Sequence, residues 1–130
     1  MSANPQVTFQ TDFFKPIAGE EDATNPDRYG KALAQWLAER LKERGVGVVG
    51  IVPEDFGWVV MVSRKPFKLW LGCGNTDGST NEWSVFPVAE PSMIQRLFRR
   101  VNLEPELENL RAHLADLIPL IPGVSNVRWE

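Results

Sequence analysis

Four short apolar segments separated by turn-forming residues occupy residues 46–88, and this pattern restricts the fold more than any other feature of the sequence. The segments cover residues 46–52, 58–63, 67–73 and 82–88, and they are rich in β-branched and aromatic residues. The connections between them contain the Pro, Gly, Asn and Asp residues that are typical of turns. We therefore predict an antiparallel meander of four strands across this stretch.

The first connection of this meander runs Pro53-Glu54-Asp55-Phe56-Gly57. Pro53 suits the second position of a type I turn, and Gly57 suits the left-handed residue that follows such a turn. We therefore predict a hairpin with a five-residue loop, which places Glu54 and Asp55 at its tip.

Two segments with helical periodicity flank the meander. The first covers residues 26–44, where Asn25 suits the N-cap and Pro26 the first helical position. The second covers residues 104–118 and begins with acidic residues, which complement the positive end of a helix. Their apolar stripes are Tyr29, Leu33, Trp36, Leu37 and Leu41 in the first, and Leu107, Leu110, Leu114, Leu117 and Ile118 in the second.

Each stripe occupies only one side of its helix, so both helices are expected to pack on one sheet face. With further strands at residues 7–14 and 124–129 and a short helical segment after Pro91, we predict an α+β fold. It is a mostly antiparallel sheet of five or six strands with two or three helices packed on one face, in a single domain spanning residues 1–130. The predicted core residues are Leu33, Trp36, Leu37, Leu41, Val60, Leu69, Leu71, Val85, Leu110, Leu114 and Leu117.

Charge and composition exclude several classes of function. The net charge of −3 and the pI near 5.2 argue against binding of nucleic acid, which normally requires a basic face. No apolar run approaches the ~20 residues of a membrane span, and the N-terminus lacks the pattern of a signal peptide. A single cysteine cannot form an internal disulfide, so we expect a reducing, cytoplasmic setting.

Cys73 and His113 are each the only residue of their type, which raises the possibility of a nucleophile and its base. No motif surrounds either residue, Cys73 falls on an apolar strand face, and His113 falls on the flank of its helix stripe. We therefore favour structural roles for both, and keep them as the polar groups of a pocket only in an alternative interpretation.

No cofactor or metal ion is expected. The glycine-rich stretch 72–81 is followed by a strand, whereas the phosphate-binding glycine loops are followed by a helix. With one His and one Cys, carboxylates would be the main ligands left for a metal.

Glu54 and Asp55 are adjacent, and neighbouring side chains in an extended or turn segment point apart. The two carboxylates are therefore expected to keep a hairpin tip solvated, and any function they have is expected to be recognition of a partner rather than catalysis.

Tryptophans supply the second set of candidate binding residues. Strand alternation places Trp70 with Lys68 on the face opposite Leu69, Leu71 and Cys73, which is the face away from the helices. Trp58 or Phe86 joins it there, depending on the pleat of the neighbouring strands. Aromatic residues among polar neighbours are typical anchors of protein interfaces.

These observations favour a non-enzymatic protein-binding module, such as an inhibitor, an immunity-type protein or an accessory subunit. Its binding residues are predicted to be Glu54, Asp55, Trp58 and Trp70, and its partner is another protein or a second copy in a homodimer centred near Trp70. The alternative is a small enzyme or ligand-binding protein with a pocket between sheet and helices.

The helix "LAQWLAERLKERG", the glycine-containing strand after it and the hairpin "PEDFGWVV" together resemble a family of small bacterial proteins. The resemblance covers roughly residues 29–75 and depends on the motif Pro-Glu-Asp-aromatic-Gly-Trp. It implies a small cytoplasmic bacterial protein, and it brings no catalytic residues and no assigned function.

Overall fold

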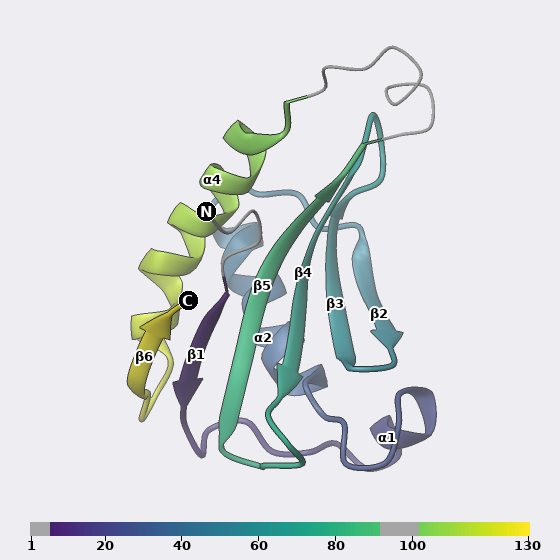
Figure 1. The fold of residues 1–130 in the computed structure, drawn as a ribbon, viewed down its shortest axis with the longest axis vertical. Helices are drawn as coiled ribbons and strands as arrows, with labels where there is room; N and C mark the ends of the chain where they lie inside the picture. The colour runs from purple at the N-terminus through teal and green to yellow at the C-terminus, as the bar shows by residue number, and fades with distance from the viewer. Residues whose placement is uncertain (1–5, 92–101) are drawn as a thin grey trace.

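The computed structural model describes residues 6–91 and 102–130, which form one antiparallel sheet of six strands with helices against it (Figure 1). The strands are β1 (Val7–Gln10), β2 (Gly50–Glu54), β3 (Gly57–Ser63), β4 (Lys68–Asn75), β5 (Glu82–Glu90) and β6 (Ser125–Trp129). The helices are α1 (Glu20–Ala23), α2 (Lys31–Glu43) and α4 (Glu104–Leu117), and a 3-10 helix, η1 (Ile118–Leu120), follows α4. This architecture confirms the predicted α+β class.

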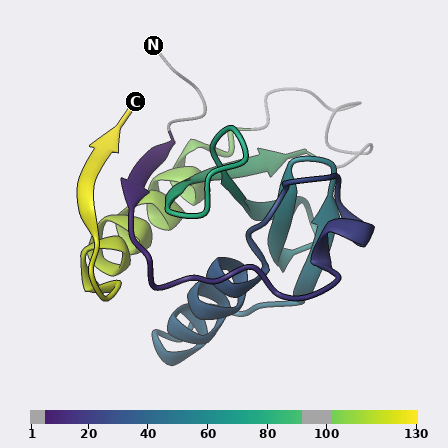
Figure 2. The same cartoon turned by 90° about the horizontal axis from the view of Figure 1, so that it is seen from below.

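The strand order is β2-β3-β4-β5-β1-β6, so the predicted meander forms most of the sheet. β1, from the start of the chain, pairs with β5 on one side and with β6, from the end of the chain, on the other. Figure 2 shows β1 and β6 together at one margin of the sheet. Within the described ranges, no helix has both the length and the apolar character needed to cross a membrane.

The first hairpin is tighter than predicted. Glu54 pairs with Gly57, so only Asp55 and Phe56 form the loop and the expected five-residue connection is wrong. Pro53 lies within β2, which is an edge strand and therefore tolerates a residue without an N–H group. Residues 46–49, predicted as part of β2, instead connect the end of α2 to the sheet edge.

The first long helix also begins later than predicted. Asn25 does not cap it, because its side-chain amide donates to the carbonyl of Asp55 at 3.1 Å. Asp27 has a φ of 61°, which a helix interior does not allow. The helix starts at Lys31 after Gly30, and residues 20–23 form the separate short helix α1. The predicted helix 104–118 agrees with α4, whereas most of the segment predicted to be helical after Pro91 lies outside the described residues.

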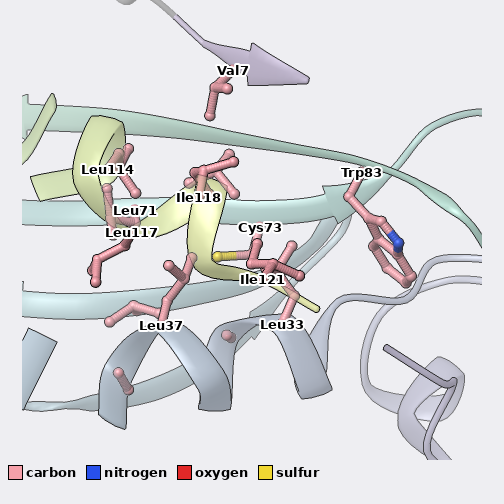
Figure 3. Close-up of a cluster of buried hydrophobic side chains, with 14 of the residues drawn as sticks. Val7, Leu33, Leu37, Leu71, Cys73, Trp83, Leu114, Leu117, Ile118 and Ile121 are labelled. Carbon is pink, nitrogen blue, oxygen red and sulfur yellow. The ribbon is translucent and has the colours of Figure 1, made fainter. Parts of the chain in front are cut away.

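The core lies between one sheet face, the inner face, and the helices α2 and α4 (Figure 3). Nine of the eleven predicted core residues are buried: Leu33, Leu37, Leu41, Val60, Leu71, Val85, Leu110, Leu114 and Leu117. Trp36 and Leu69 are partly buried and pack against this cluster from its margin. The helices therefore cover the inner face, as the one-sided stripes predict.

Two glycines allow the hairpin and the start of α2 to approach β4 closely. A Cβ atom at Gly57 would lie 2.4 Å from the backbone oxygen of Cys73, and one at Gly30 would lie 2.5 Å from the same oxygen. Their φ values are 153° and 147°, a region that other residues rarely adopt. The carbonyl of Cys73 is thus a point where three segments meet without side chains between them.

We predict that Gly57→Ala lowers the free energy of unfolding by about 2–5 kcal/mol, because backbone strain and a clash with a backbone oxygen add together. Gly50→Ala is the matched control in the neighbouring strand, where an added Cβ meets no atom within 4 Å. Urea denaturation of both variants measures the difference. Equal stabilities of the two variants would contradict the close approach.

Candidate functional site

Three aromatic side chains gather on the sheet face opposite the core, the outer face. Phe56 and Trp70 stack with ring centroids 6.5 Å apart, and Phe86 lies 5.4 Å from Phe56 and 6.1 Å from Trp70. We call these three residues the outer aromatic cluster. The ring of Phe86 lies directly over Gly72, where a Cβ atom would be only 2.2 Å from it. A glycine on β4 therefore makes room for the aromatic ring of β5.

A cavity of about 180 Å³ lies beside the outer aromatic cluster, and we call it the outer cavity. Apolar side chains of three neighbouring strands line it, and charged groups stand among them. The lining residues are Val52, Glu54, Phe56, Val59, Met61, Lys68, Trp70 and Glu90. The cavity thus combines an apolar surface with two carboxylates and one ammonium group.

Trp70 is fixed in this cavity by its polar atom. Its indole Nε1 donates to the Oε1 atom of Glu90 at 2.7 Å, and both side chains are partly buried. An indole N–H that is withdrawn from water needs an acceptor, so this bond holds the ring in one orientation beside Phe56 and Phe86.

The hairpin acids divide between two roles. Glu54 lines the outer cavity with Trp70, so the structure brings these two predicted binding residues together. Asp55 lies next to them at the exposed hairpin tip, and its backbone carbonyl accepts the bond from Asn25 described above. Glu54 and Asp55 are thus consistent with a solvated turn, and the carboxylate of Glu54 also borders the outer cavity.

Trp58 lies on the opposite face of the sheet from Trp70. Its side chain is 5% exposed and belongs to the core, and its indole Nε1 donates to Oε1 of Glu20 at 2.9 Å. The ammonium group of Lys31 lies 5.0 Å from the centre of its ring. The pleat phase left open by the sequence is therefore resolved: Phe86 joins Trp70 on the outer face, and Trp58 packs inward.

The buried carboxylate of Glu20, on α1, is a feature that sequence reasoning missed. Besides Trp58, its Oε1 atom accepts from the backbone N–H groups of Gly30 and Lys31, both at 3.1 Å, and its Oε2 atom accepts from that of Ile17 at 2.6 Å. Glu20 thus caps α2 from outside the helix. Its acceptor atoms are occupied by protein groups, which indicates a structural role.

Cys73 and His113 do not meet. Cys73 is fully buried in the core beside Leu33 and Ile121 (Figure 3), and this burial raises the pKa of its thiol well above the ordinary range. His113 lies on the flank of α4, where its Nδ1 atom accepts from Nε of Arg44 at 2.9 Å. A buried, protonated thiol and an imidazole held on the surface cannot act as a nucleophile and its base.

His113 and the hairpin acids also lie at opposite ends of α2. Asp55 contacts the segment that leads into this helix, whereas Arg44 is its C-cap. Thirteen helical residues span roughly 20 Å, so no single pocket joins these groups. Within residues 6–91 and 102–130, no group of three or more His, Cys, Asp or Glu side chains is placed to hold a metal ion.

A second apolar depression, of about 320 Å³, borders the exposed side of α2. Phe13, Phe14 and Trp36 line it together with Ala32, Gln35, Glu39 and Arg40, and Phe13 is 49% exposed. The guanidinium of Arg40 covers the Trp36 ring at 5.4 Å and is paired with Glu43. This groove was not predicted, although the adjacent Phe13 and Phe14 hint at it, since only one of two neighbours in an extended segment can point inward.

Comparison with protein-family models, with curated protein sequences and with solved structures finds no match to this chain. The resemblance of residues 29–75 to small bacterial proteins therefore stays a prediction.

We predict that Glu20→Ala lowers the free energy of unfolding by about 2–5 kcal/mol, because it leaves four N–H donors without their acceptor. Glu20→Gln should cost less, since an amide oxygen can replace one carboxylate oxygen. Asp22→Ala, an exposed position on the same helix, is the control and should change stability by less than about 0.5 kcal/mol. Denaturant titration followed by tryptophan fluorescence measures all three. A Glu20→Ala protein as stable as the Asp22 variant would exclude the capping role.

We also predict that the Cys73 thiol does not react with a disulfide reagent at pH 8 in the folded protein. Burial blocks access and raises its pKa, so almost no thiolate is present. In guanidinium chloride one thiol per chain should react within the mixing time. Rapid and complete reaction of the folded protein would contradict the placement of Cys73 in the core.

Proposed function

We propose that the protein is a non-enzymatic protein-binding module that docks its partner on the outer sheet face. The observation that carries this proposal is the outer aromatic cluster beside the outer cavity, on the face opposite α2 and α4. Tryptophan and phenylalanine next to a small apolar depression with a polar rim are the arrangement of an interface hot spot.

The arrangement of polar groups favours binding over catalysis. Trp58 and Glu20 are bound to each other, Cys73 is a core residue, and His113 is engaged by Arg44. The candidate groups that do meet, Glu54 and Trp70, supply charge and apolar area to a partner.

Docking on the face is also favoured over docking on an edge. The edge strand β2 contains Pro53, which cannot donate to an added strand. The other edge strand, β6, has a register shift opposite Thr8 to Gln10 and a φ of 52° at Asn126, and such irregularities hinder strand addition. These features favour a partner that binds the outer sheet face, because neither edge strand is suited to pairing with an added strand.

We predict that Trp70→Ala weakens partner binding by at least ~2 kcal/mol, which is about thirtyfold in dissociation constant. Phe13→Ala is the matched control, because it removes an exposed aromatic ring from the groove beside α2. The wild-type protein and both variants serve as bait in affinity capture from the native host, after thermal melting shows that each is folded. Proteins held by the wild type and by the Phe13 variant, but lost with the Trp70 variant, are expected. Identical captures by all three would contradict docking on the outer face.

The homodimer predicted from the sequence would use the same face and is tested separately. Light scattering after size exclusion gives the mass over a range of micromolar concentrations. A mass of twice 14.7 kDa that falls to one chain with Trp70→Ala would identify the partner as a second copy. A mass of 14.7 kDa at every concentration would exclude the homodimer, and the partner on the outer face would then be a different protein.

A further inference from the structure

We propose that the outer cavity receives an arginine side chain of the partner protein, an inference that rests on the proposed function and names the chemistry of its partner. The occupant is indicated by the size of the cavity, by its apolar floor and by the uneven distribution of charge around it.

The size of the outer cavity fits one side chain. Its volume of about 180 Å³ is below the ~300–1,000 Å³ typical of pockets for drug-sized ligands. Val59 and Met61 are both buried and line it from β3, and Val52 lines it from β2. Such a floor suits the methylene stem of a long side chain, which packs along apolar surface while its charged head stays near water.

Charge around the outer cavity is uneven. Lys68 and Glu90 are register partners across β4 and β5, so the positive and negative charges at that end offset each other. Glu54 pairs with Gly57 at the far end of β3, and Asp55 follows it at the exposed tip. Within the part of the chain that the structure describes, no ion pair within 4.0 Å involves either acid. The hairpin end of the cavity is therefore negative.

A cationic head is the complement of that end, and a guanidinium suits it better than an ammonium. Its planar fork matches a carboxylate such as Glu54, it is more weakly hydrated, and it stacks on aromatic faces. Phe56, which lines the cavity at the hairpin end, and Trp70 supply such faces. Arginine is also the charged residue most enriched at interface hot spots. The net charge of −3 further favours approach of a basic surface.

The test uses a single side chain as the probe. N-acetyl-arginine methylamide is titrated into 15N-labelled protein, and the indole N–H resonances of the five tryptophans are followed, with Trp70→Phe assigning the Trp70 signal. The expected result is a saturable shift of the Trp70 resonance in the millimolar range appropriate to one side chain. The citrulline analogue, which has the same shape without the charge, should bind several-fold more weakly.

Variants locate the charge that is recognised. Glu54→Gln should weaken binding of the arginine probe roughly fivefold, because it removes the carboxylate at the hairpin end of the outer cavity. Glu39→Gln, at the groove beside α2, is the control and should have no effect.

Equal binding of arginine and citrulline, a shift confined to other tryptophans, or no saturable shift would each overturn the inference. So would an effect of Glu39→Gln as large as that of Glu54→Gln. If the Trp70 variant loses captured proteins while the probe gives no saturable Trp70 shift, docking on the outer face stands and the arginine inference fails. If the capture is unchanged as well, the proposed function fails with it.

Discussion

One buried carboxylate, that of Glu20, connects the parts on which the rest of this structure depends. It accepts N–H groups from the start of α2, from the indole of Trp58 on β3 and from Ile17 just before α1. A buried charge is costly unless it is fully hydrogen-bonded, and here four donors surround it. The positive end of α2 favours the same charge. The result is a fixed entry of α2 onto the inner sheet face.

The hydrogen bonds of Glu20 affect the arrangement of side chains on both faces of the sheet. With α2 held at its first residues, Gly30 lies against the carbonyl of Cys73, and the apolar stripe of the helix meets β3 and β4. The pleat of β3 turns Trp58 toward the core, and the hydrogen bond from its indole N–H to Glu20 holds it there. Trp70, which the pleat of β4 turns the other way, is left to the outer face, where it forms a cluster with Phe56 and Phe86. The two tryptophans differ in role because of which face each side chain occupies.

Local patterns predicted much of this fold. The two-residue alternation in residues 67–73 placed Trp70 outward, and the helical stripes placed Leu33, Leu37, Leu110 and Leu114 in the core, because both patterns depend only on periods of the backbone. The start of α2 was predicted wrongly because Asn25 and Pro26 carry the local signals of a helix start, whereas the acceptor in use comes from a separate segment. The predicted hairpin loop was too long, because the pairing of β2 with β3 continues through Pro53. An edge strand allows a proline at such a position.

The candidate site was only partly predictable, because local sequence patterns do not show which distant segments meet. Glu54 and Trp70 could be named from the hairpin and from strand alternation. Their meeting in one cavity depends on the pairing of three strands, which places Val52 opposite Val59 and Met61 opposite Trp70. Glu20 could not be found at all, because its partner Trp58 is 38 residues away and nothing in the sequence between them marks the contact. Gly72 could have indicated the position of the Phe86 ring, since a glycine within a strand often marks a place where another group lies close to the backbone.

Native-state hydrogen exchange of the N–H groups bonded to Glu20 measures directly whether this carboxylate fixes the start of α2. The backbone amides of Gly30 and Lys31 and the indole N–H of Trp58 all donate to it, so they should open only with the central strands. We expect these three groups to exchange with the same free energy of opening as the amides of β3 and β4. Exchange of the Gly30 and Lys31 amides at the rate of an exposed loop, while β3 and β4 stay protected, would contradict it.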